Sequence, residues 1–238
     1  MTIAFANLGA SANPDIASTA NATSYDNTSW TPPTSGLIVV FVSNRGNTDP
    51  ENVAPTISGN GLTWTQIKTA VRGTSYRITL FGANASGSSA GVTTISFGSN
   101  TQQFCMASFF HATGVDLAGG VAAAFVQSPT STGFGSASSV TLASAGHADN
   151  RPVFGCSQST NIAQSPRTNW TEADDRTVTS PTDGLETQWR SDAFETTASS
   201  TWTQDEDWTA IAAELKATVA AGSLIYNPGS DLAPLIVR

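Results

Sequence analysis

The chain is built from short segments rich in Val, Ile, Phe and Trp, which Ser, Thr, Gly and Pro residues interrupt. In several of these segments apolar and polar residues alternate, and this alternation, with β-branched and aromatic residues, is the sequence signal of a β-strand. Only residues 210–218 have the Ala, Glu, Leu and Lys content of a helix, and they alternate as well, so we predict a strand there. These features predict an all-β sandwich.

The same pattern predicts where the strands lie. Residues 36–44 contain an unbroken apolar run, which predicts burial on both faces of that strand. Residues 128–139 are rich in Ser, Gly and Thr and are expected to form a loop, while residues 120–127 are a further candidate strand. The predicted strands span residues 3–7, 36–44, 62–70, 75–83, 91–98, 103–113, 139–143, 152–157, 169–173, 185–190 and 208–217.

A length of 238 residues suits one large β domain better than two small ones. With 39% hydrophobic and 12% charged residues, the chain has enough apolar surface for a core. We expect an N-terminal strand and loosely packed arm in residues 1–35, a β-sandwich domain in residues 36–218 and an extended C-terminal tail in residues 219–238. The predicted core consists of Leu37, Val39, Phe41, Trp64, Ile78, Leu80, Ile95, Phe97, Phe104, Phe109 and Ile211.

The charge balance limits the classes of partner. The net charge is −8, and ten Lys and Arg residues are few for binding phosphates, so no nucleic-acid partner is expected. No apolar run approaches the ~18 residues of a membrane span, so no membrane partner is expected. The first residues lack a charged region followed by an apolar one, and we therefore expect synthesis in a cytoplasm without a secretory signal.

Residues suited to metal binding or nucleophilic catalysis are scarce. The two His and two Cys residues are His111, His147, Cys105 and Cys156, and their spacing matches no zinc motif. We expect no metal and no cofactor. Both Cys residues lie in apolar predicted strands, which favours buried free thiols over a disulfide.

The acidic residues leave one catalytic alternative open. With two His as possible bases and no Gly-x-Ser-x-Gly turn between a strand and a helix, we do not expect an enzyme. A glycosidase would need two carboxylates facing each other in a groove. We interpret the acidic residues 174–175 and 205–207 as solvated turns, with calcium binding as the alternative. The Glu residues available for a catalytic pair are Glu172, Glu186, Glu195 and Glu214.

The six Trp residues divide into two groups. Trp64 and Trp208 lie inside alternating segments and are expected in the core. The others lie near segment ends or loops, where an exposed ring can stack on the face of a sugar. This candidate ligand platform consists of Trp30, Trp170, Trp189 and Trp202.

Several segments resemble a β-sandwich module of tailed-bacteriophage structural proteins and their prophage-derived bacterial homologues. The likeness extends over about residues 36–217. It implies a jelly-roll-like antiparallel β-sandwich with the role of a virion structural protein, and it brings no catalytic residues. The segments that carry it are GLTWT at 61–65, ITLFGA at 78–83, GVTTISF at 91–97, SFFHATGVD at 108–116, WTE at 170–172 and AIAAELK at 210–216.

The C-terminal tail is apolar beyond the last predicted strand. Exposing apolar surface to water costs about 25 cal/mol per Å², so burial of the tail is expected. Pro228, Gly229 and Pro234 exclude a continuous helix, which predicts an extended arm that binds a neighbouring subunit rather than its own sandwich. The predicted assembly interface is Leu224, Ile225, Tyr226, Leu232, Pro234, Leu235, Ile236 and Val237.

These observations together predict a non-enzymatic virion structural protein, either a capsid decoration protein or another surface component of the head or tail. It would be made in the host cytoplasm and located in the virion. The expected partners are capsid or tail subunits and further copies of the chain. The alternative is a carbohydrate-binding or receptor-binding β-sandwich module that binds a surface glycan, which an exposed row of aromatic residues would favour.

Overall fold

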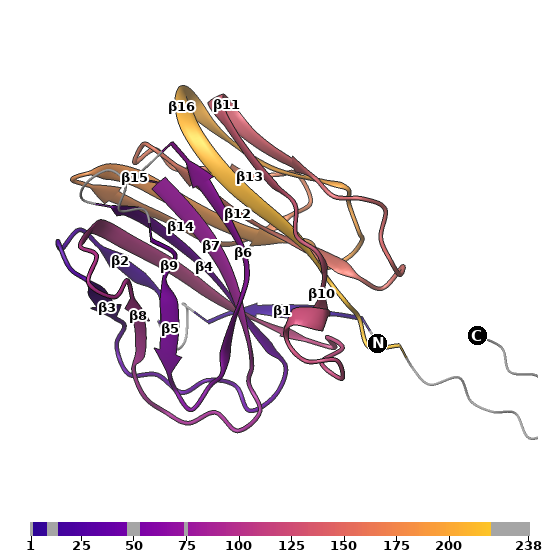
Figure 1. Cartoon of the computed structure of the whole chain (residues 1–238). Coiled ribbons are helices and arrows are strands. Elements are labelled where there is room, and N and C mark those ends of the chain that lie inside the picture. Colours follow the sequence, from indigo (N-terminus) through magenta and orange to yellow (C-terminus); the bar gives the residue numbers. More distant parts are fainter. Residues whose placement is uncertain (1, 9–13, 47–52, 74–75, 220–238) are drawn as a thin grey trace, which may run out of the picture.

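The computed structural model describes residues 2–8, 14–46, 53–73 and 76–219, and this part of the chain is almost entirely β-structure (Figure 1). Three antiparallel sheets pack together, and one 3-10 helix, η1 (Ala122–Ala124), accompanies them. The prediction of an antiparallel β-sandwich is confirmed.

Two large sheets form the sandwich. The first has the order β1-β9-β4-β7-β6, with β2 also paired to β9, and the second has the order β10-β16-β12-β15-β14, with β11 and β13 also paired to β16. The strands of the first sheet are β1 (Ala4–Asn7), β2 (Ile16–Ser18), β4 (Leu37–Gly46), β6 (Trp64–Arg72), β7 (Tyr76–Asn84) and β9 (Gln102–Thr113). Those of the second are β10 (Phe125–Gln127), β11 (Thr130–Thr141), β12 (Arg151–Gln158), β13 (Ser165–Pro166), β14 (Thr171–Thr179), β15 (Thr182–Trp189) and β16 (Thr197–Leu215).

A small third sheet covers the outer side of the first. Its order is β3 (Ser24–Asp26), β8 (Thr93–Ser96) and β5 (Thr56–Gly59). Tyr25 and Ile95 from this sheet are buried with Val40 of β4 and Phe109 of β9. The first sheet is therefore enclosed on both sides.

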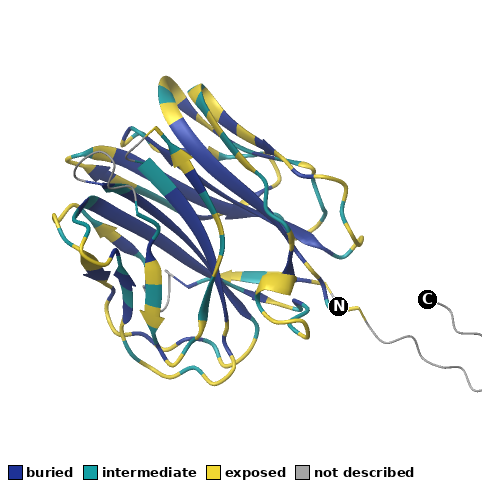
Figure 2. Ribbon diagram, viewed as in Figure 1, coloured by how far each residue is buried: buried dark blue, intermediate teal, exposed yellow. Residues whose placement is uncertain are grey.

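Strand β4 shows how the sequence produces this layering. It lies between β7 and β9 in the first sheet, and its residues 37–42 are fully buried (Figure 2). Leu37, Val39 and Phe41 belong to the core between the two large sheets, while the residues between them face the small sheet. The predicted burial on both faces is confirmed.

The predicted core is confirmed at every position except one. Trp64 is half-buried and packs against the cluster under the small sheet, while the other predicted core residues have at most 1% of their surface exposed. A third apolar cluster covers the outer face of the second sheet and includes Phe154, Trp170 and Trp208. Trp208 is thus buried as predicted.

Two expectations about irregular segments are wrong. Residues 128–139 are not a loop, because β11 runs through them and pairs with β16 along its length. The N-terminal strand predicted at 3–7 is present as β1, but the described residues that follow it up to residue 35 are not a loosely packed arm, since they supply β2 and β3 and bury Ile16 and Trp30. In both cases backbone pairing with a distant strand determines the structure. A segment rich in small and polar residues carries no sequence signal of that pairing.

The other predicted strands are present, with different ends. Residues 208–217 fall in the second half of β16, which begins earlier, at Thr197. Of the candidate strand at 120–127, only the last three residues form β10, after the 3-10 helix. The short strands β2, β3, β5 and β13 have no strong alternation, and the sequence pattern does not predict them.

Candidate functional site

The candidate tryptophan platform is buried. The exposed fractions are 4% for Trp30, 6% for Trp170, 6% for Trp189 and 7% for Trp202. The ring of Trp189 lies 5.3 Å from that of Phe5 and 5.3 Å from that of Phe110, inside the main core. The expectation of exposed rings is wrong.

These tryptophans are buried because other segments pack over the strand ends where they lie. Trp30 lies under the small sheet, where its Nε1 donates a hydrogen bond to Thr93 Oγ1 at 3.0 Å. Trp170 and Trp202 belong to the cluster on the outer face of the second sheet, and Trp170 Nε1 donates to Glu195 Oε2 at 2.9 Å. The position of a Trp near the end of a segment in the sequence does not show whether another segment will pack over its ring.

Two of the four candidate Glu residues have structural roles. Glu214 is fully buried, and its Oε1 accepts hydrogen bonds from Asn150 Nδ2 at 2.6 Å and from the Gly146 backbone N–H at 2.7 Å. Its Oε2 accepts a hydrogen bond from Gln127 Nε2 at 2.6 Å. The Glu214 carboxylate thus accepts three hydrogen bonds. Two of the donors, Gly146 and Asn150, lie just before β12, so Glu214 stabilises the turn there.

Glu195 is likewise held by internal partners. Its Oε1 lies 2.6 Å from Arg167 Nη2, and its Oε2 lies 2.5 Å from Arg190 Nη1. With the hydrogen bond from Trp170 described above, this carboxylate joins three segments that cover the second sheet. Glu195 and Glu214 are thus both held by donors from within the chain.

The structure does bring two other acidic residues together. Glu186 of β15 and Asp175 of β14 are directly opposite each other in the antiparallel register, so their side chains lie on the same face of the sheet. Glu186 is fully buried, and neither of its carboxylate oxygens has a hydrogen-bond partner among the described residues. Asp175 Oδ2 accepts a hydrogen bond from the Gln164 backbone N–H at 3.0 Å, while its Oδ1 has no partner there.

Burial shifts the protonation of this pair. Burial raises the pKa of Glu186 to about 9, and the negative charges of Glu172 and Asp175 add to the effect. Burial also raises the pKa of Asp175 to about 6, against the hydrogen bond from Gln164. At neutral pH Glu186 is therefore protonated and Asp175 mostly ionised, an acid and a base side by side, but Glu186 is enclosed rather than open to a groove as a glycosidase requires.

The acidic segments lie in strands rather than in turns, contrary to the expectation, although Asp205 and Asp207 are exposed to solvent as expected. Asp174 and Asp175 lie inside β14, and residues 205–207 lie inside β16. Asp207 forms an ion pair with Arg72 of the first sheet at 2.6 Å. Asp174 is paired with Arg176, and burial raises the pKa of Asp174 to about 6. The Asp207 ion pair connects the two large sheets, whereas Asp174 and Arg176 both lie in β14.

The described His and Cys residues do not form a common site. Cys105 and Cys156 are both buried free thiols, as predicted, and burial raises the pKa of Cys156 to about 12. His111 Nε2 lies 2.7 Å from the Ser35 backbone oxygen. In residues 2–8, 14–46, 53–73 and 76–219, no three His, Cys, Asp or Glu side chains are grouped closely enough to hold a metal ion.

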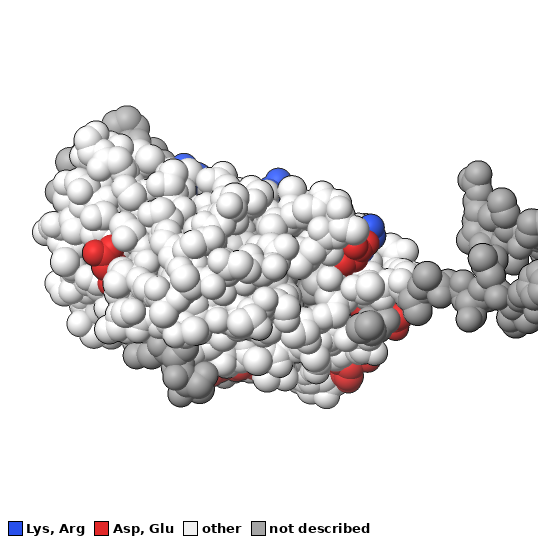
Figure 3. All heavy atoms as spheres, turned by 90° about the horizontal axis from the view of Figure 1, so that it is seen from below, with Lys and Arg blue, Asp and Glu red and all other residues white. Residues whose placement is uncertain are grey.

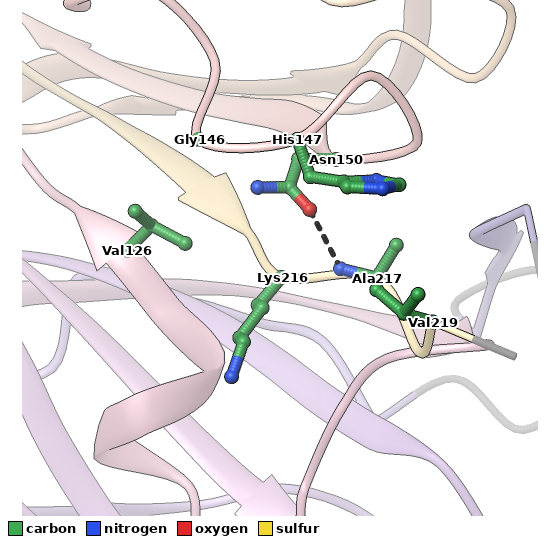
Figure 4. Close-up of a pocket in the computed structure, with 7 residues that line it drawn as sticks. All are labelled: Val126, Gly146, His147, Asn150, Lys216, Ala217 and Val219. Atoms are coloured by element: carbon green, nitrogen blue, oxygen red, sulfur yellow. Dashed lines mark hydrogen bonds between the residues drawn. The ribbon is translucent and has the colours of Figure 1, made fainter. Parts of the chain in front are cut away.

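A pocket of about 190 Å³ lies where the described part of the chain ends (Figure 4). Val126 of β10 lies on one side of it and Val219 on the other, with exposed fractions of 47% and 59%. The Ala217 backbone N–H donates to Asn150 Oδ1 at 2.9 Å, which fixes the chain as it leaves β16. The pocket is lined by Val126, Gly146, His147, Asn150, Lys216, Ala217 and Val219.

The predicted assembly interface falls outside the described residues. Leu224, Ile225 and Tyr226 follow the pocket residue Val219 in sequence after four small residues, and Leu232, Pro234, Leu235, Ile236 and Val237 follow later. The pocket is therefore the part of the described surface closest along the chain to these residues.

Comparisons with protein-family models, curated proteins and solved structures find no match. The described residues contain no helix of the length and hydrophobicity that crossing a membrane requires.

Proposed function

We propose that this protein is a non-enzymatic structural protein of a virion, a capsid decoration protein or another head or tail surface component. It is made in the host cytoplasm and binds capsid or tail subunits through its C-terminal segment. The observation that carries the proposal is the pocket lined by the exposed Val126 and Val219, because Val219 directly precedes the C-terminal segment with its apolar residues.

The surface chemistry supports a role in protein contacts. On the face shown in Figure 3, charged side chains are few and are separated by wide areas of uncharged surface. Protein interfaces are depleted in charged residues at their centres, and only 12% of this chain is charged. An apolar segment next to such a surface gains free energy by docking on a neighbour.

The acidic residues support the non-enzymatic part of the proposal. Glu195 and Glu214 are held by internal donors, and Glu186 is enclosed. The alternative of a glycan-binding module loses its candidate platform, because Trp30, Trp170, Trp189 and Trp202 are buried.

The test uses virions from a source that encodes the chain. Mass spectrometry of gradient-purified particles should find the protein in a fixed ratio to the major capsid protein. Particles that lack it should bind the added full chain, and they should lose at least tenfold in affinity for a chain that ends at Val219. The melting curve of the shortened chain should match that of the full chain, because the sandwich ends before the tail.

A matched pair of substitutions tests the pocket itself. Val126→Lys places a charge in the pocket and should weaken particle binding, while Val92→Lys changes a valine of similar exposure (41% against 47%) outside it and should not. Absence of the protein from purified particles contradicts the virion assignment. Undiminished binding of the shortened chain contradicts the arm.

A further inference from the structure

The free edge of β11 is an unusual surface. Strand β11 pairs with β16 on one side, and β12 occupies the other side of β16, so β11 forms the edge of the second sheet after β10. Within the described residues no strand pairs with its outer side. Alternate residues of this twelve-residue strand thus present backbone N–H and C=O groups at an open edge.

Other sheet edges carry features that discourage pairing. Strand β14 contains the acidic Asp174 and Asp175, and β6 contains the basic Lys68 and Arg72. The edge strands β1, β2, β3 and β5 have only three or four residues each. Charges and short length are usual means by which proteins protect edges from other strands.

Strand β11 has no charge and no proline. Its sequence is TSTGFGSASSVT, and its one irregularity is the register shift between Gly135 and Ala137. Phe134 at its centre has an exposed fraction of 71%, the highest of any large apolar side chain among the described residues. Val126, on the neighbouring edge strand β10, is exposed as well. The longest open edge is therefore also uncharged and apolar at its centre.

We propose that this edge is an interface between two copies of the chain, in which the two β11 strands pair antiparallel around a twofold axis beside Phe134. Such pairing joins the second sheets of both copies into one continuous sheet and brings the two Phe134 rings together. The chain has a net charge of −8, so an uncharged edge is where a second copy meets the least repulsion.

The acidic residues nearest to β11 do not oppose this arrangement strongly. Glu206 and Asp207 are opposite Gly135 and Phe134, one strand back on β16. Across the proposed interface the two β16 strands are separated by three strand spacings, about 14 Å. This distance exceeds the screening length of about 8 Å at physiological salt. Raising the salt concentration should therefore strengthen the dimer slightly.

Disulfide crosslinking tests directly whether the two β11 strands pair at Phe134. Opposite residues in an antiparallel pair have Cα atoms about 4.5 to 5.5 Å apart, within the range that a disulfide spans. Phe134→Cys in the full chain should give a covalent dimer under mild oxidation, because the native Cys105 and Cys156 are fully buried and unreactive. Val92→Cys, at an exposed position on another part of the surface, should not.

Solution mass completes the test. The full chain should sediment as a dimer at micromolar concentration, and Phe134→Lys should weaken dimerisation at least tenfold without changing the melting curve of the monomer. The chain that ends at Val219 should remain a dimer, because the interface uses no residue of the tail. This separates the proposal from the arm function.

Any of three results overturns the proposal. The first is a wild-type chain that stays monomeric at 100 micromolar, and the second is a dimer whose strength Phe134→Lys leaves unchanged. The third is equal crosslinking of the Phe134→Cys and Val92→Cys variants, since it would indicate random collision.

Discussion

Strands β4 and β15 are both buried along nearly their whole length, but with opposite chemistry. Residues 37–42 of β4 are all apolar and fully buried. Strand β15 has the sequence TDGLETQW and fully buries Asp183, Glu186, Thr187 and Gln188. The first strand is buried because of its own side chains, whereas the second is buried because other segments cover it.

The difference shows what a buried polar strand needs. Thr187 Oγ1 lies 2.7 Å from Ser108 Oγ of the first sheet, and Gln188 Nε2 donates to the Ser199 backbone oxygen at 2.9 Å. Glu186 has no such partner among the described residues. Buried polar groups are stable when they are hydrogen-bonded, and an unpartnered carboxyl group becomes neutral instead.

The largest expected effect is in β4. Phe41→Ala should lower the free energy of unfolding by about 3–5 kcal/mol, because Phe41 packs against Phe110 and fills the space above Gly155. Phe41→Leu keeps most of the volume and should cost only about 1–1.5 kcal/mol. Chemical denaturation measures both. Equal losses for the two variants would show that volume does not determine stability at this position.

The second effect concerns Glu186 and depends on pH. Its folded-state pKa is raised from 4.5 to about 9, so the folded protein retains a proton that the unfolded chain releases. The stability linked to this proton is fully present below about pH 4.5 and is lost as the pH rises towards 9. Asp175, with its pKa raised to about 6, adds to the same trend at lower pH.

Glu186→Gln should therefore stabilise the protein at pH 8, by about 2–4 kcal/mol, and flatten the dependence of stability on pH. The matched control is Glu214→Gln, which replaces a carboxylate that accepts three hydrogen bonds and should lower stability by about 1–3 kcal/mol. Urea denaturation at several pH values measures both. Destabilisation by both variants at pH 8 would contradict a neutral, unpartnered Glu186.

The smallest expected effect concerns Thr187 of β15, whose side chain is hydrogen-bonded to Ser108. Thr187→Val should cost about 1–2 kcal/mol, since it leaves Ser108 buried without its partner. Adding Ser108→Ala should recover part of this loss, because both ends of the hydrogen bond are then apolar. A double-mutant cycle with additive losses would mean that this inter-sheet hydrogen bond does not contribute to stability.

Comparison of particular elements shows how far the sequence predicts the fold. The apolar run of β4 predicts a central strand buried on both faces, and the segments Trp64–Arg72 and Tyr76–Asn84 alternate strongly enough to be located within about two residues. The sequence predicts a loop at residues 128–139, which form most of β11, because Ser and Gly carry no signal of the backbone pairing with β16 that orders them.

The candidate site is harder to predict for a related reason. Glu172, Glu186, Glu195 and Glu214 are equivalent in sequence, and nothing local distinguishes the carboxylate that three donors hold from the one that has none. The raised pKa of Glu186 and the role of Glu195 come from residues elsewhere in the chain, such as Asp175 opposite Glu186 and Trp170 beside Glu195.

The sequence alone determined the all-β class, most strand positions, the apolar core and the burial of both thiols, because alternation and apolar content are properties of each segment taken separately. Tertiary structure decided that the four tryptophans are buried, that Glu186 is enclosed beside Asp175 and that β11 is an open edge. Each of these depends on which distant segment covers or pairs with a strand, and non-local pairing leaves no periodic signal in the strand itself.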